Sequence, residues 1–267
     1  MKTKTYVIVT AVLLLGACSG QAVLTDKTFT SSGQILPGEE WGNVGIYNDD
    51  TVVDMLGGGV DSMGTYDAST LNVLDGYVST LEAYEFSTVN VSGGQVYSLW
   101  ARDFGTARLS DAGSVFSLIA RDYGVVNMTG GTADHGSALE SGILNIFAGL
   151  ISDGIGADYT GTLNMSGGVT QGANFRGEAT ANLYGGTISE FLMATEESTV
   201  NIFGYDLVLT SSGGSYGYGQ VTGFWLDDMP FTINLNGADT YTHINLIPEP
   251  ASLLLLSLGA LVLARKR

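Results

Sequence analysis

Two arginine–acid–aromatic triplets carry the residue types in this sequence that could do chemistry. Arg102-Asp103-Phe104 and Arg121-Asp122-Tyr123 begin 19 residues apart, and further acid–aromatic pairs occur at Glu85-Phe86 and Asp158-Tyr159. Carboxylates are hard oxygen ligands for Ca²⁺, and aromatic rings can stack on a sugar. The triplets could therefore form a sugar or Ca²⁺ site. The alternative is a structural corner in which the charges form salt bridges and the rings stack on one another.

Catalysis would place stricter demands on the same region. A lyase or hydrolase would need two acids and an arginine between Arg102 and Asp122, beside a groove. Elsewhere, His135 next to Asp134, and close to Glu140, is a candidate general base, in a stretch that we expect to be a loop. A catalytic site usually interrupts a regular sequence pattern, and the spacing here hardly changes. We therefore expect no enzymatic activity, no catalytic residue, no metal site and no cofactor, with Ca²⁺ left open.

A repeat of 18–19 residues must position these side chains. Apolar and polar residues alternate within it, as at residues 89–91, which predicts a strand. One polar anchor marks each copy: Asp54, Asn72, Asn90, Arg108, Asn127, Asn145, Asn164, Asn182 and Asn201. A glycine four residues after the anchor predicts a corner with positive φ. These glycines are Gly58, Gly76, Gly94, Gly131, Gly149, Gly168 and Gly186.

So short a repeat, built from alternating strands, predicts an all-β parallel β-solenoid (β-helix) of about nine coils. A single coil cannot bury its apolar face, whereas stacked coils share a continuous core. The open ends of such a sheet need caps. We expect an N-terminal cap at 23–49, coils at 50–207 and a small antiparallel β cap at 208–246. Alternating apolar residues indicate the second cap: Trp225, Phe231, Ile233 and Leu235.

One outward row of the predicted solenoid is rich in threonine beside the anchor asparagines. Its members are Thr70, Thr88, Thr106, Val125, Ile143, Thr162, Thr180 and Thr199. A Thr-x-Asn face is similar to that of ice-binding solenoids, and ice or crystal binding is a weaker alternative. Val125 and Ile143 interrupt the row. Threonine suits exposed strands, and stacked asparagine amides can bond from coil to coil, so we expect a structural role for this face.

The N-terminus predicts export. Two lysines precede an apolar run at 6–17, the pattern of a secretory signal peptide, which we place at residues 1–22. Cys18 follows residues 15–17 in a pattern that resembles the bacterial lipoprotein box, which would make Cys18 the lipidated residue. Ordinary cleavage nearby, for example after Ala22, is the open alternative. A disulfide framework is excluded, because this cysteine is the only one in the chain.

The C-terminus has three parts in a fixed order. Pro248, Glu249 and Pro250 precede an apolar segment at 253–264, and the chain ends in a basic cluster formed by Arg265, Lys266 and Arg267. Terminal cations hold a membrane helix in one orientation. The order resembles the PEP-CTERM sorting signal of bacterial proteins that are processed by an exosortase, a membrane transpeptidase-like enzyme. A plain membrane anchor is the alternative.

The PEP-CTERM resemblance implies that residues 247–267 are a sorting signal. It implies an exported protein, transiently anchored in the inner membrane by a C-terminal transmembrane helix, with an exosortase-type enzyme as a partner. It also implies the cell envelope, the outer surface or the extracellular space as destination, and an association with extracellular polysaccharide.

The charge balance excludes some partners. Lys plus Arg is 10 and Asp plus Glu is 27, for a net charge of −17. Five cations and one acid lie outside residues 23–246, which leaves 5 cations against 26 acids and a body charge near −21. So acidic a body disfavours nucleic acid, which needs phosphate neutralisation. It also disfavours adhesion to anionic lipid, and it favours solubility and cation binding.

These observations predict an exported structural or adhesive protein of the envelope or extracellular matrix, associated with polysaccharide. The second hypothesis is a carbohydrate-active enzyme. Arginine and aspartate on a solenoid are similar to the pectate lyases and related right-handed β-helix enzymes, which use acidic Ca²⁺ ligands with a basic residue. This chain departs from them in its shorter coils and in its lack of long inserted loops.

Overall fold

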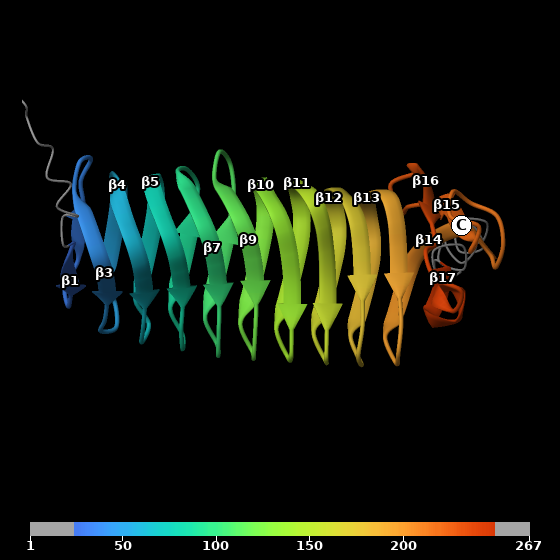
Figure 1. The fold of residues 1–267 in the computed structure, drawn as a ribbon, viewed down its shortest axis with the longest axis horizontal. Helices are drawn as coiled ribbons and strands as arrows, with labels where there is room; N and C mark the ends of the chain where they lie inside the picture. Colours follow the sequence, from blue (N-terminus) through green and yellow to red (C-terminus); the bar gives the residue numbers. More distant parts are fainter. Residues whose placement is uncertain (1–23, 249–267) are drawn as a thin grey trace, which may run out of the picture.

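A computed structural model describes residues 24–248 as a rod of stacked β turns (Figure 1). The region 1–22 with Cys18, together with Glu249, Pro250 and the 253–267 segment, lies outside the described residues. The strands are β1 (Thr25–Phe29), β2 (Gly33–Ile35), β3 (Glu40–Ile46), β4 (Val52–Thr65), β5 (Thr70–Ala83), β6 (Thr88–Val91), β7 (Gln95–Ala101), β8 (Thr106–Leu109), β9 (Ser114–Ala120), β10 (Val125–Leu139), β11 (Ile143–Asp158), β12 (Thr162–Phe175), β13 (Thr180–Ala194), β14 (Thr199–Thr210), β15 (Gln220–Phe224), β16 (Pro230–Asn234) and β17 (Ile244–Pro248). A short 3₁₀ helix, η1 (Thr240–His243), precedes β17.

Each turn pairs in parallel with the next, as the repeat predicted. The anchors align directly: Asn145 pairs with Asn164, and Asn164 pairs with Asn182. The same row continues beyond the nine predicted anchors, because Gln34 pairs with Asp54 and Asn245 pairs with Asn201. The protein is therefore an all-β parallel β-solenoid of about ten turns, against the nine coils expected from the anchors.

The extra coil lies in the range that we expected to be an N-terminal cap. β2 and β3 pair in parallel with β4, and β1 pairs in parallel with β3. These strands therefore begin the solenoid ladder. Their sequence signal is weak, because Gln34 replaces the usual asparagine and lies 20 residues before Asp54.

Apolar side chains point into the rod at alternate positions. Val89 and Val91 are fully buried while Asn90 between them faces outward, which is the arrangement predicted from their alternation. One inward row shows how the core continues from turn to turn: Val53, Leu71, Val89, Ala107, Val126, Leu144, Leu163, Ala181 and Val200 are all fully buried. The core is thus a column that runs the length of the rod.

Glycines form the first corner of the turns. All seven predicted corner glycines have positive φ, between 70° at Gly94 and 106° at Gly149. A side chain at Gly94 would also collide with the previous turn, since a Cβ there would lie 2.7 Å from the Gly76 carbonyl oxygen. Glycine is required there both for its conformation and for the close approach of two turns.

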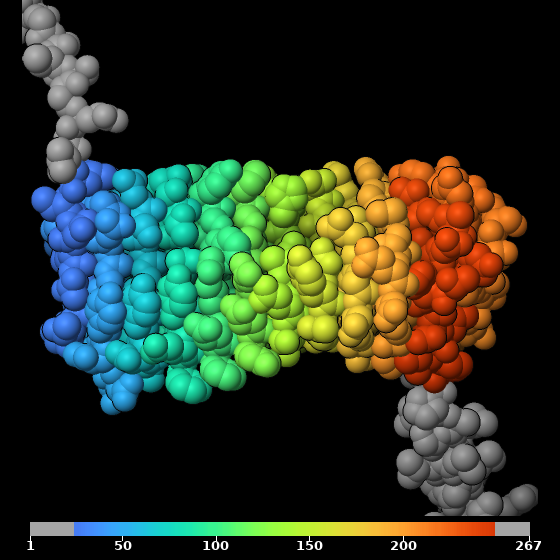
Figure 2. Space-filling view, turned by 60° about the horizontal axis from the view of Figure 1, so that its bottom comes forward, coloured from blue at the N-terminus to red at the C-terminus, as the bar shows by residue number. Residues whose placement is uncertain are grey.

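The C-terminal end is closed by a small β layer and a final parallel strand. β14, β15 and β16 are antiparallel, as the alternating apolar residues predicted. Trp225 stacks on Phe231 at a centroid distance of 3.8 Å, and its Nε1 donates to the Gly186 carbonyl at 3.1 Å. β17 then returns to pair in parallel with β14. The space-filling view shows the turns in close contact from the first strand to this cap (Figure 2).

Candidate functional site

The two predicted triplets lie at the same corner of neighbouring turns. The backbone N–H groups of Arg102 and Arg121 each donate to an alanine carbonyl of the preceding turn at 2.9 Å. Asp103 and Asp122 follow in the left-handed region, with φ of 53° and 57°. Aspartate enters this region more readily than most residues. The predicted adjacency of the two arginines is therefore correct, and the turn explains the acid that follows each of them.

The Arg102 guanidinium is held by the preceding turn. Its Nη2 lies 3.0 Å from Glu82 Oε1, with side chains only 29% and 19% exposed. The guanidinium carbon also lies 4.4 Å from the centroid of the Trp100 ring and 5.9 Å from that of Tyr84. Burial and a hydrogen bond from its hydroxyl to Glu82 raise the pKa of Tyr84. This arginine is thus paired and stacked, as the structural alternative predicted.

Arg121 bonds in the opposite direction, to the following turn. Its Nε and Nη2 donate to Glu140 Oε1 at 3.1 and 2.7 Å. These bonds lower the pKa of Glu140, and a hydrogen bond to Glu140 together with burial raises the pKa of Asp122. Arg121 therefore pairs with Glu140, and the neighbouring Asp122 holds its proton more readily than an ordinary aspartate.

Aromatic rings form an exposed row beside the arginines. Phe104 stacks on Phe86 at 5.5 Å and on Tyr123 at 5.4 Å, each with an interplanar angle of 9°. The three side chains are 72% (Phe86), 56% (Phe104) and 60% (Tyr123) exposed. Because neighbouring rings cover one another's faces, the row presents mainly ring edges to solvent. It is a ridge along the rod, and a sugar could lie flat only against its end rings.

The fourth predicted pair does not extend this row. Asp158 is the last residue of β11 and pairs with Leu139, so it stands one position before the turn. Tyr159 occupies the left-handed position, with φ of 57°. The Asp158-Tyr159 pair is therefore displaced by one residue from the other acid–aromatic pairs, because the left-handed positions Glu140 and Tyr159 are 19 residues apart.

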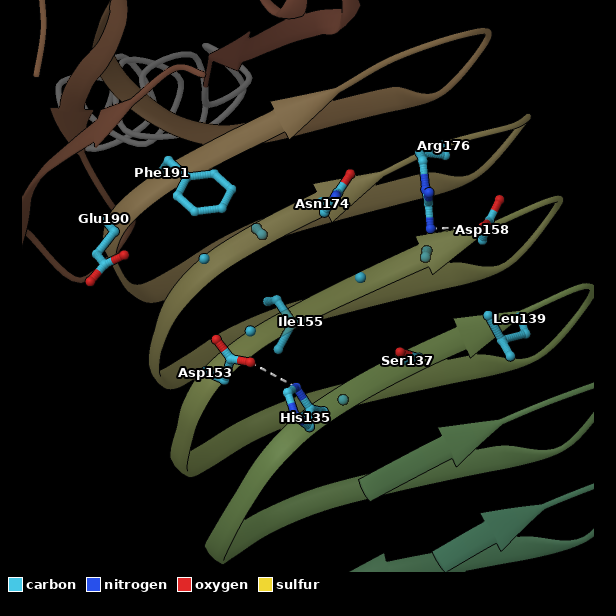
Figure 3. A pocket seen from close by; sticks show the side chains of 16 residues that line it. His135, Ser137, Leu139, Asp153, Ile155, Asp158, Asn174, Arg176, Glu190 and Phe191 are labelled. Atoms are coloured by element: carbon cyan, nitrogen blue, oxygen red, sulfur yellow. Dashed lines mark ion pairs between the residues drawn. The ribbon is translucent and has the colours of Figure 1, made fainter. Parts of the chain in front are cut away.

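A hollow lies farther along the rod, in later turns of the sheet face that carries Trp100 (Figure 3). We call it the trough; it has a volume of about 330 Å³ and spans β10 to β13. The residues that define it are His135, Asp153, Gly154, Gly172, Asn174 and Phe191. Neither arginine of the predicted triplets lines it. The enzyme hypothesis required a groove beside Arg102 and Arg121, whereas this hollow lies between β10 and β13.

His135 lies in a strand rather than in the loop that we expected. It belongs to β10, and its Nδ1 is 3.1 Å from Asp153 Oδ2. Its ring meets Phe116 edge to face, with centroids 5.3 Å apart. At the other side of the trough, Arg176 Nη2 lies 3.3 Å from Asp158 Oδ2 (Figure 3). A histidine–carboxylate contact and an arginine–carboxylate ion pair therefore flank the hollow.

The trough exists because side chains are missing from successive turns. His135 pairs with Gly154, and Gly154 pairs with Gly172. Earlier turns carry serine in this row, as at Ser98 and Ser117. The sequence does contain a signal for this hollow, namely glycines in register on neighbouring strands. It was missed because the register shifts at the bend before Gly154.

Two kinds of feature are absent from residues 24–248. No group of three or more His, Cys, Asp or Glu side chains in this range could hold a metal ion. No helix within the same range is long and apolar enough to cross a membrane. The apolar segment predicted at 253–264 lies outside the range.

The end of the solenoid leads directly into the C-terminal segment. β17 ends at Pro248, and residues 246–267 match the family model of the PEP-CTERM protein-sorting motif. The chain carries a PEP-CTERM motif. The motif implies an exported protein that is sorted by an exosortase and is transiently anchored in the membrane before processing. Neither a curated protein nor a solved structure matches the chain.

Proposed function

We propose that this protein is a non-enzymatic, exported rod of the cell envelope or extracellular matrix that is sorted by its PEP-CTERM motif and adheres to extracellular polysaccharide. The observation that carries the proposal is the row of parallel strand pairs that runs through the anchor residues from β2 to β14 and on to β17, next to a sorting motif. Such a ladder gives a long surface with a fixed spacing between rows. An extended, repeated surface suits adhesion to a polymer that is itself repeated.

The state of the arginines supports a structural role at the corner. Arg102 is engaged by Glu82, and Arg121 by Glu140. A group that abstracts or donates a proton must reach its substrate, and both guanidinium groups are held by carboxylates of their own rod. On this proposal the triplets stabilise the corner, and no cofactor is required.

Export and adhesion can be tested together. The full chain is expressed in a bacterium with an exosortase and in the same strain without it, and the cell fractions are compared. We expect processed protein at the surface or in the medium only in the first strain. The processed protein is then sedimented with the polysaccharide of that bacterium, with and without Ca²⁺. Absence of saturable binding in both conditions would overturn the adhesive role.

A carbohydrate-active enzyme is the second candidate, because the His135–Asp153 pair stands at the edge of the trough. A histidine paired with a carboxylate can act as a general base. The test is release of reducing ends or of unsaturated sugars from the same polysaccharide. Turnover that disappears in His135→Gln, with the melting temperature unchanged, would favour the enzyme over the adhesive rod.

A further inference from the structure

We propose that the trough binds a short segment of a neutral oligosaccharide. The inference rests on the proposed function and assigns its binding site. It places recognition at the trough between β10 and β13, and not at the arginine–aromatic corner identified from the sequence. Four properties of the trough support it: a floor without side chains, an aromatic wall, balanced charges and a buried acceptor without a partner.

The floor is flat because of its glycines. Gly154 and Gly156 lie at outward positions on β11, and Gly172 lies beside Gly154 on β12, where the Phe191 ring covers it. Earlier turns carry large side chains in the row of Gly156, including Trp100 and Ile119. Glycine lets a ligand approach the backbone closely. A sugar ring, which is flat and has C–H groups on its faces, fits such a floor.

Phe191 forms the apolar wall at the far end. Its ring leans over the floor, since a Cβ built on Gly172 would lie 3.0 Å from the Phe191 Cζ. Figure 3 shows this ring at the opposite end of the trough from His135. An aromatic wall beside convergent polar groups is typical of small-ligand sites. Here the ring can pack against the C–H face of one sugar.

The charges of the trough favour a neutral ligand. His135 pairs with Asp153, and Arg176 pairs with Asp158, so no cation is left over to attract an anion. Glu190 adds a further carboxylate at the rim. The body as a whole carries a charge near −21 (5 cations against 26 acids in residues 23–246). A polyanion such as an acidic polysaccharide would be repelled, whereas hydroxyl groups can bond to carboxylates and to the guanidinium alike.

Asn174 supplies an acceptor that the protein leaves unused. Its Oδ1 is buried and has no hydrogen-bond partner among residues 24–248. A buried polar atom without a partner is costly, and such atoms in native proteins call for an explanation. Asn174 lines the trough on β12 (Figure 3). The Asn174 side chain would have to turn toward the trough before a ligand hydroxyl could donate to this oxygen and provide the missing bond.

The test uses the processed protein and the polysaccharide of the exporting bacterium, separated by anion exchange into a neutral and an acidic fraction. Ser137→Trp fills the trough without straining the strand, because Trp100 and Ile119 occupy the same row in earlier turns. Thr80→Trp is the matched control, on an outward position of β5 far from the trough. Melting temperatures confirm that both variants fold.

We expect wild type and Thr80→Trp to bind the neutral fraction alike, and Ser137→Trp to bind it at least about tenfold more weakly, which is ~1.4 kcal/mol. Phe191→Ala should also weaken binding, by removing the wall. Equal binding by Ser137→Trp and Thr80→Trp, or binding of the acidic fraction alone, would overturn this inference and leave the adhesive rod standing. Binding of neither fraction by wild type would overturn both.

Discussion

Asn164 Nδ2 donates a hydrogen bond to Asn145 Oδ1 at 2.8 Å, across the boundary between two turns of the solenoid. The same relationship joins Asn182 to Asn164 at 2.8 Å and Asn201 to Asn182 at 2.9 Å. Each amide therefore donates to one neighbour and accepts from the other. The row confirms the expectation that the anchor asparagines bond from coil to coil, and it fixes the vertical register of the turns.

Replacing Asn164 by leucine should destabilise the rod by about 1–3 kcal/mol, because it leaves the amides of Asn145 and Asn182 each without one partner. The measurement is the free energy of unfolding by denaturant. Thr162→Ala, two residues earlier on the same outward face, is the control and should cost less than about 0.5 kcal/mol. If the free energy of unfolding fell equally in the two variants, the hydrogen bonds of the amide row would add little to stability.

Corner glycines should be far less replaceable than glycines of the cap loop. Gly94→Ala forces a residue with a side chain into a left-handed conformation, at about 1–2 kcal/mol, and also drives its Cβ against the Gly76 carbonyl. Gly213 has a similar φ of 87° with nothing within 4 Å of a built Cβ. Gly213→Ala should therefore show the conformational cost alone. A melting temperature lowered equally by both would contradict a role for close turn-to-turn contact.

The repeat and its strands could be predicted because they depend on local alternation and on a constant spacing. The place of Asn245 in the asparagine row could not be predicted, because Asn245 follows Asn201 by 44 residues and the whole cap is inserted between them. Spacing carries no signal when the intervening segment leaves the solenoid. The first coil was missed for a related reason, because Gln34 departs from the asparagine row in both identity and spacing.

The corner was predictable in position but only partly in contacts. A spacing of 19 placed Arg102 and Arg121 on neighbouring turns, yet Arg102 turns back to Glu82 and Arg121 turns forward to Glu140. The direction of each arginine side chain depends on its neighbours. The Arg102 guanidinium packs on the Trp100 ring, and the next turn has Ile119 at that position. The trough arises where glycines on neighbouring strands leave no side chains above the sheet. It could not be predicted by looking only for residues that are chemically reactive.

Arg102→Gln should cost about 1–3 kcal/mol of stability, because the partly buried Glu82 loses its charge partner and the Trp100 and Tyr84 rings lose a packed cation. Arg121→Gln should cost less, since its pair is more exposed. Thermal unfolding of both variants, together with assays on polysaccharide, is the measurement. A loss of turnover with normal melting would instead indicate a catalytic corner.

The carboxyl pair at the corner gives a prediction about pH. The folded-state pKa of Asp122 is raised, so its ionisation at neutral pH opposes folding, and this penalty is relieved as the pH falls through its folded pKa. Asp122→Asn, which keeps a side chain suited to the left-handed turn, should therefore raise the melting temperature at pH 7. The gain should vanish below the unfolded aspartate pKa of about 3.9.

Glu140 should show the opposite dependence. Arg121 lowers its folded-state pKa, so its contribution is present above the unfolded glutamate pKa of about 4.3 and is lost as the pH falls through the folded value. Melting curves between pH 7 and pH 3 for wild type, Asp122→Asn and Glu140→Gln separate the two effects. Asp111→Asn is the matched control, because Asp111 is also left-handed but accepts from the Ser110 hydroxyl. If Asp111→Asn stabilised the protein as much as Asp122→Asn at pH 7, relief of general negative charge would explain the gain, and the contact between Asp122 and Glu140 would not.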